Sequence, residues 1–225
     1  MGATEELFEA VKTGQVAKVE ELLGREPTLL AARSPKGGLS PVVVAAYYGQ
    51  QGVLQALLRH GPDLDVHEAA LVGDAGRVRA LVERSPELVS AISKDGFPPL
   101  GLAAYMGRAD VVRYLLDRGA DPEYANPGTG FTALTGAVSN GHEDVVRLLL
   151  EHGVNVNYHY EGGKLTPLHA AIMEGDAGIV RLLLEHGADA NAKMDDGKSA
   201  LALALASGTA AAPIVTLLKK HGAQP

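Results

Sequence analysis

The chain contains no cysteine and no tryptophan among its 225 residues. Without cysteine it has no disulfide, no thiolate-bound zinc or iron–sulfur cluster and no cysteine nucleophile. This absence fits a reducing compartment, so we expect a cytoplasmic protein. Aromatic residues make up only 4% of the sequence, although an ordinary globular core depends on large rings. We therefore expect a core packed from small side chains.

Positive charge is also scarce, since 20 Lys and Arg stand against 27 Asp and Glu and give a formal net charge of −7. Phosphate backbones and anionic lipids attract the opposite sign, so we expect no nucleic acid and no membrane as partner. The first residues lack the basic and apolar segments of a secretory signal. One alanine-rich stretch, residues 199–218, approaches membrane-spanning length, but it contains Ser, Gly, Thr and Pro. We interpret it as part of a soluble fold.

What the sequence does contain is an internal repeat. The segments VVRYLLDRGAD, VVRLLLEHGVN and IVRLLLEHGAD begin at residues 111, 145 and 179, which are 34 residues apart each time. Fainter copies carry a glycine and a pair of aliphatic residues at corresponding positions. Self-similarity at this period is typical of repeat architectures. The whole chain then forms one domain of seven units, at approximately 4–36, 37–65, 66–95, 96–126, 127–160, 161–193 and 194–225.

Each unit shows the pattern of two helices. In the second helix of one unit the apolar residues fall at 111, 112, 115 and 116, which is one face of a helix with 3.6 residues per turn. The first helix is shorter and uses small residues such as Ala103 and Ala104, which let neighbouring helices approach closely. Turn signals such as Asp95-Gly96 separate the units. A unit is therefore helix, loop, helix and a projecting turn, which we call a finger.

The stretch KLTPLHAAIMEGDAGIVRLLLEHGADANA, residues 164–192, resembles an ankyrin repeat, including the Thr-Pro-Leu-His opening. The resemblance implies an all-α fold, an ankyrin-repeat solenoid of about seven helix–loop–helix units with short projecting β-turns. The composition and the lack of another domain look like stand-alone bacterial ankyrin-repeat proteins. The resemblance also implies a structural role for His169. Other units depart from the opening motif at residues 40–43, 98–101, 132–135 and 199–202, so we expect irregular first helices there.

A longer duplication overlies the short repeat. Five residues recur 59 positions later, so that Phe8, Gly14, Leu22, Pro27 and Gly37 correspond to His67, Gly73, Leu81, Pro86 and Gly96. Two-unit blocks at about 5–65 and 66–125 therefore look duplicated. The loop glycines Gly49 and Gly73 are only 24 residues apart, ten fewer than the repeat. We therefore expect the finger between units two and three to be missing.

Catalytic and metal-binding patterns fail on spacing. Gly197-Lys198-Ser199 lacks the earlier glycine of a phosphate-binding loop, and His67-Glu68 lacks the second histidine of a zinc-protease helix. Packed helices lie about 8–10 Å apart, too far for histidines of successive units to share a zinc ion at about 2 Å. We interpret the aligned histidines as groups at helix C-termini, namely His60, His152, His186 and His221. We expect no enzyme, no metal and no cofactor.

The candidate partner surface consists of positions whose residues differ from unit to unit, while the core and turn positions repeat. The resemblance implies that partners bind the concave face, at the ends of the first helices and on the fingers. Tyrosine and methionine, which are enriched in interface centres, concentrate there in the middle of the chain. The candidate partner-binding residues are Tyr47, Tyr48, Tyr105, Met106, Phe131, Asn140, Tyr158, Tyr160 and Met173.

A competing interpretation is that these rings only seal neighbouring units against one another. We assign Tyr114 to such packing, because it occupies a core column of a second helix. We favour exposure for Tyr47, Tyr48, Tyr105, Met106, Tyr158 and Tyr160, and we take residues 158–163 as the most individual finger.

The function expected from this pattern is that of a non-catalytic, monomeric module that binds a protein partner through its concave face and fingers. The alternative is a dedicated inhibitor or immunity protein of one specific enzyme or toxin. The sequence alone does not separate the two, because neither requires a further domain.

Overall fold

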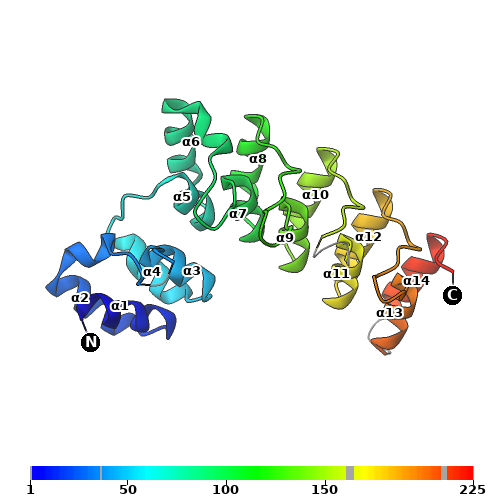
Figure 1. The fold of residues 1–225 in the computed structure, drawn as a ribbon, viewed down its shortest axis with the longest axis horizontal. Helices are drawn as coiled ribbons and strands as arrows, with labels where there is room; N and C mark the ends of the chain where they lie inside the picture. Colours follow the sequence, from blue (N-terminus) through cyan, green and yellow to red (C-terminus); the bar gives the residue numbers. More distant parts are fainter. Residues whose placement is uncertain (1, 36, 161–164, 209–211, 225) are drawn as a thin grey trace.

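The computed structural model describes residues 2–35, 37–160, 165–208 and 212–224. Within these ranges the chain forms seven consecutive helix pairs, two 3₁₀ helices and no strand, and the only β-pairing consists of isolated bridges. Figure 1 shows the pairs stacked side by side in one curved array from α1 to α14. The elements are α1 (Ala3–Lys12), α2 (Val16–Arg25), η1 (Pro27–Ala31), α3 (Pro41–Tyr47), α4 (Gln51–Arg59), α5 (Val66–Val72), α6 (Ala75–Arg84), η2 (Pro86–Ser90), α7 (Pro99–Tyr105), α8 (Ala109–Asp117), α9 (Ala133–Ser139), α10 (Glu143–Glu151), α11 (Pro167–Met173), α12 (Ala177–Glu185), α13 (Ala200–Ala206) and α14 (Ala212–Lys220).

The Thr-Pro-Leu-His opening explains how a first helix begins. Thr166 is the N-cap of α11, and Pro167 at the first helical position has the φ that the helix needs. The Thr166 backbone N–H donates to Nδ1 of His169 at 3.2 Å, which leaves Nε2 to donate to the carbonyl of Ala192 at 3.2 Å. His169 is fully buried. The ring therefore joins the start of α11 to the following finger.

The expectation of irregular first helices is wrong. Where the opening motif departs, the helices α3, α7, α9 and α13 are nonetheless regular and seven residues long. Ser40 and Ser199 cap α3 and α13 by accepting a backbone N–H with their hydroxyl groups, and Thr132 does the same for α9. A capping hydroxyl or a proline in the first turn is sufficient, because most of the stability comes from packing against the neighbouring repeats.

Small side chains build the core, as the composition predicts. The alanine pairs of the first helices are buried, for example Ala69 with Ala70 and Ala103 with Ala104. Tyr114 of α8 is only 7% exposed, which confirms its assignment to packing. The guanidinium carbons of Arg79 and Arg118 lie 5.2 Å and 4.9 Å from the centre of its ring. The ring is therefore held between two cations on the side of the second helices.

In three of the repeats, through Gln50, Arg108 and His142, the residue after the loop glycine bonds to the repeat before. Gln50 donates to the carbonyl of Lys12 at 2.8 Å, and Arg108 donates to that of Leu71 at 3.1 Å. The approach is so close that a Cβ on Gly73 would lie 2.8 Å from the Arg108 side chain, at a φ of +89°. Glycine is required there for both reasons. In repeat three this position is Asp74, which instead caps α6 through the N–H of Arg77.

The finger between repeats two and three is missing, as the glycine spacing predicts. Only residues 60–65 connect α4 to α5, and Figure 1 shows this connection as an extended segment. Along the row of second helices, α4 and α6 are the neighbours that lack extended contact among the described residues, whereas α3 still packs against α5. The chain is therefore built as two blocks, α1–α4 and α5–α14, that meet at an incomplete interface.

The described part of the alanine-rich stretch forms α13 and most of α14 in the last repeat, and residues 209–211 lie outside the described residues. These two short helices belong to the helical array. Among the described residues, no helix has the length and apolar character needed to cross a membrane.

The buried Leu183 tests the register of the second helices. Its side chain is fully buried in α12, so Leu183→Ala should lower the free energy of unfolding by about 2–5 kcal/mol through lost contacts and a cavity. Urea denaturation followed by circular dichroism measures the loss. Arg181→Ala, at an exposed position of the same helix, should change the free energy of unfolding by less than about 0.5 kcal/mol. Equal effects of the two substitutions would contradict the register.

The buried His169 predicts acid sensitivity. Burial lowers the pKa of its ring, against the opposing effect of its hydrogen bond to Ala192. The unfolded chain takes up a proton near pH 6.5, which the folded ring resists, so this contribution to stability is complete above pH 6.5 and falls as the pH drops below it. Between pH 7.5 and 5.5, wild type should lose more free energy of unfolding than His169→Gln does. Equal losses in urea titrations at the two pH values would refute the assignment.

Candidate functional site

The first helices and the fingers display most of the predicted partner-binding residues. In Figure 1 the first helices α7, α9 and α11 lie on the inner side of the curve, below α8, α10 and α12. Tyr48 and Met173 are 56% and 57% exposed, and Asn140 is exposed as well. Tyr47 is 39% exposed. Four further candidates are half-buried, namely Tyr105, Met106, Phe131 and Tyr158.

The expectation that Tyr160 is exposed is wrong. Only 3% of Tyr160 is accessible, because its backbone pairs with Leu165 at the base of the finger. Its ring meets that of Phe131 edge to face, with the ring centres 5.4 Å apart. Tyr160 therefore seals two neighbouring fingers, as the competing interpretation held. Residues 161–163 of the predicted finger lie outside the described residues.

A small cavity, which we call the aromatic pocket, lies where α3, α7 and two fingers meet. It has a volume of about 300 Å³. Three of the predicted residues line it, Tyr47, Tyr105 and Phe131, and the structure thus brings together side chains that lie far apart in the sequence. The other lining residues are Asp95, Phe97, Leu102 and Thr129.

Two residues joined by a hydrogen bond between the two blocks form one wall of this pocket. The hydroxyl of Tyr47 donates to Oδ2 of Asp95 at 2.5 Å, from the end of α3 to the tip of the finger before α7. Burial, and then the bond to Asp95, raise the pKa of the Tyr47 hydroxyl well above its usual value. The carboxylate of Asp95 also accepts from Ser93, and its backbone carbonyl accepts from Asn126 at 2.8 Å. Asp95 therefore links repeat two to two successive fingers.

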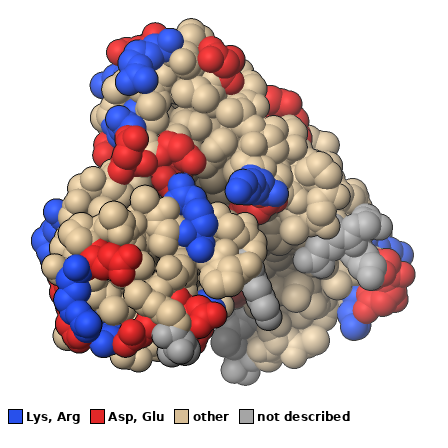
Figure 2. All heavy atoms as spheres, turned by 60° about the vertical axis from the view of Figure 1, so that its left-hand side comes forward, with Lys and Arg blue, Asp and Glu red and all other residues tan. Residues whose placement is uncertain are grey.

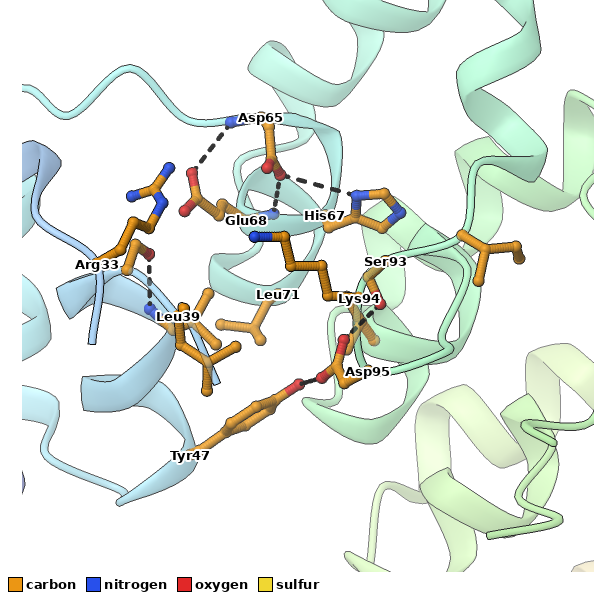
Figure 3. A pocket seen from close by; sticks show the side chains of 15 residues that line it. Arg33, Leu39, Tyr47, Asp65, His67, Glu68, Leu71, Ser93, Lys94 and Asp95 are labelled. Atoms are coloured by element: carbon orange, nitrogen blue, oxygen red, sulfur yellow. Dashed lines mark hydrogen bonds and ion pairs between the residues drawn. The ribbon is translucent and has the colours of Figure 1, made fainter. Parts of the chain in front are cut away.

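On the other side of this bond lies a second cavity, which we call the junction cleft. It has a volume of about 310 Å³, lies between α3, α5 and the finger before α7, and shares Tyr47, Asp95 and Leu102 with the aromatic pocket. Figure 3 shows Tyr47 pointing across it to Asp95, with Leu39 and Leu71 nearby. The charged residues on its walls are Arg33, Asp65, Glu68, Lys94 and Asp95.

Sequence reasoning missed the charged residues of the junction cleft. They come from three separate loops and one helix, and no periodicity relates them. The short spacing between Gly49 and Gly73 was the one signal that could have located them, because a missing finger leaves the next interface incomplete.

Two further cavities adjoin these. One, which we call the linker cavity, has a volume of about 250 Å³ and lies beside the connection between α4 and α5, where Gly61, Pro62 and Asp63 line it. It shares Arg33, Ser40 and Glu68 with the junction cleft. The other is a larger hollow of about 630 Å³ between α1 and α3, with Lys12 and Tyr48 on its walls.

The charges on this end of the molecule are mixed. Figure 2 shows Lys and Arg interspersed with Asp and Glu on the face that carries the N-terminal block. In the part of the chain that the structure describes, no cluster of histidine and acidic residues has the arrangement of a metal site. His152 and His186 instead bond carbonyls in the last turn of their own helices, at 2.7 Å and 2.9 Å. This confirms the helix-terminal interpretation for these two residues.

The arrangement suits recognition of another molecule's side chains. Rings with polar tips stand beside small, largely apolar cavities, and such rings bury area at little entropic cost.

Comparison with protein families gives two matches. A model described as ankyrin repeats (3 copies) matches residues 66–160, and one described as ankyrin repeats (many copies) matches residues 149–204. Together the matches span residues 66–204, more than half of the chain, and they begin where the second block begins. No curated protein matches the sequence.

The bond between Tyr47 and Asp95 can be tested by removing one hydroxyl. Tyr47→Phe keeps the ring but loses the bond across the two blocks, so the free energy of unfolding should fall by about 1 kcal/mol. Tyr48→Phe is the matched control, because the Tyr48 hydroxyl makes no hydrogen bond to a described residue. Urea denaturation compares the two variants. If Tyr47→Phe lost no more free energy of unfolding than Tyr48→Phe, the bond would contribute nothing measurable to stability.

Proposed function

Because the chain belongs to the ankyrin-repeat family, whose repeats form protein–protein interaction modules, we propose that it binds a protein partner around the aromatic pocket. The contact surface extends from Tyr48 at the end of α3, through Tyr105 and Phe131, to Met173 at the end of α11. It combines the ends of the first helices with the fingers between them.

The observation that supports this choice is the pair of adjacent tyrosines at the end of α3. Tyr48 is 56% exposed with no hydrogen-bonded partner for its hydroxyl among the described residues, while Tyr47 forms the wall of a pocket beside it. Tyr48 itself lines the neighbouring hollow between α1 and α3, and exposed rings beside preformed, largely apolar pockets are typical of interface centres. Packing between repeats does not require the Tyr48 ring, since the buried residues of α3 are Pro41, Val42, Val44, Ala45 and Ala46.

A non-catalytic role agrees with the family and with the polar groups at this surface. Asp95 is the acid that lines the aromatic pocket, and its carboxylate is already engaged by Tyr47 and Ser93. A general base needs access to its substrate's proton, which these two donors occupy. The surface is therefore better suited to binding than to proton transfer.

The Tyr48→Ala/Tyr105→Ala double variant tests the proposal. The tagged chain serves as bait in an extract of its native host, and captured proteins are identified and quantified by mass spectrometry. Loss of the two rings should reduce capture of the specific partner at least about tenfold, as expected of interface hot spots. Capture of one enzyme in stoichiometric amount would identify the dedicated-inhibitor alternative.

The matched control removes two exposed side chains from second helices, Arg113→Ala/Arg147→Ala, and should capture the partner like wild type. Circular dichroism confirms that both double variants remain helical. Undiminished capture by the tyrosine variant would reject the aromatic pocket as the binding surface.

A further inference from the structure

The junction cleft contains a carboxylate that forms no ion pair with any residue that the structure describes. Glu68 is only 7% exposed, and one of its oxygens, Oε2, accepts the backbone N–H of Asp65 at 3.2 Å. No ion pair joins Glu68 to a Lys, Arg or His side chain among the described residues. Water screens a largely buried carboxylate less than an exposed one, so a cation that reaches this carboxylate would be bound favourably.

The architecture of the repeat explains only part of the role of this carboxylate. Glu68 is the third residue of α5, the position that His169 occupies in α11. His169 links its helix to the next finger through the carbonyl of Ala192, but in repeat three His67 makes the corresponding bond, to Ala91 at 3.0 Å. Glu68 instead caps α5, where the helix N-terminus favours its negative charge. An ionised carboxylate is therefore kept at the wall of the cleft.

The position of Glu68 makes the carboxylate accessible to another molecule. It lines both the junction cleft and the linker cavity, which have volumes of about 310 Å³ and 250 Å³. The aromatic pocket follows on the far side of the bond between Tyr47 and Asp95. Three cavities with shared walls thus form a line from the connection at residues 61–63 to Phe131.

Nearby charges limit what the cleft accepts. Arg33 lines the same two cavities, and among the described residues its guanidinium donates one hydrogen bond, to the carbonyl of Ala32 at 3.4 Å. Figure 3 shows Arg33 beside Glu68 with no ion pair between them, and Lys94 on the opposite wall. Both cations are exposed, so water screens them, whereas Glu68 is desolvated and its charge acts more strongly on a group inside the cleft.

We propose that the junction cleft binds an extended segment of a protein partner through a lysine or arginine side chain that pairs with Glu68. This inference rests on the proposed function and names the chemistry of the partner. Of the apolar residues on either side of the basic residue, one would enter the linker cavity beside Leu30 and Pro62, and the other would contact the rings of the aromatic pocket. An extended segment fits these three neighbouring cavities. Its side chains point alternately to opposite sides, so every second side chain can enter one cavity.

The test uses the full chain and two pentapeptides, acetyl-Leu-Ala-Arg-Ala-Leu-amide and the same peptide with citrulline in place of arginine. Citrulline has the shape of arginine but no charge. Titrations followed by the methyl NMR signals of Leu39, Val43 and Leu71 give both dissociation constants and the place of binding. The arginine peptide should bind the wild-type chain about tenfold more tightly, the ratio expected of a hydrogen bond to a buried charge.

Glu68→Gln should abolish this preference and leave α5 folded, because glutamine still accepts the Asp65 N–H. Glu87→Gln removes one negative charge from an exposed position of η2 and should keep the preference. The proposal is overturned if the wild type binds neither peptide, if it binds both equally, or if the preference survives in Glu68→Gln. A preference that appears only in Arg33→Gln would overturn it too, by showing that Arg33 occupies Glu68 in the wild-type chain. Failure here with capture still dependent on Tyr48 and Tyr105 would refute this inference alone.

Discussion

The structure depends on one constraint, that no helix pair can bury its own apolar face and each must lie against the next. Close stacking favours small residues in the first helices, and the alanine pairs at Ala69 and Ala103 follow from it. The core then needs few rings. Most of the aromatic residues that remain lie at the ends of the first helices and on the fingers, where some, such as Tyr47 and Tyr48, are exposed and others, such as Tyr160, are buried between fingers.

Much of this fold could be predicted from the sequence, because stacked repeats require the same residue types at the same positions in each unit. The spacing of glycines and aliphatic pairs predicts the helix pairs, the packing role of Tyr114 and the missing finger before α5. The burial of Tyr160 could not be predicted in the same way, since it depends on how the finger residues pair across a turn and on the neighbouring ring of Phe131. The regularity of α3 and α13 was missed because a single capping hydroxyl replaces the full opening motif.

The charged residues of the candidate site could not be predicted from the repeat period, because they do not recur from unit to unit. Arg33, Glu68 and Asp95 approach one another only because the connection at residues 60–65 carries no finger to fill the space between repeats two and three. The loss of one turn therefore has two effects. It removes a segment that would have sealed the interface, and it leaves a cleft whose walls come from unrelated positions in the sequence. Stability in a repeat array is a sum over neighbouring interfaces, so the incomplete interface is also where the array is least strongly held.

The angle between the two blocks is consequently fixed only by the contacts on the side of the first helices. Everywhere else both rows of helices pack against their neighbours and fix the curvature of the array, but between α4 and α6 the outer row has no such contact. The inner row and the hydroxyl of Tyr47 hold the blocks together there. A small rotation about this line would change the distance between Tyr48 and the later fingers while leaving every helix intact, so the curvature of the array depends at this junction on fewer contacts than elsewhere.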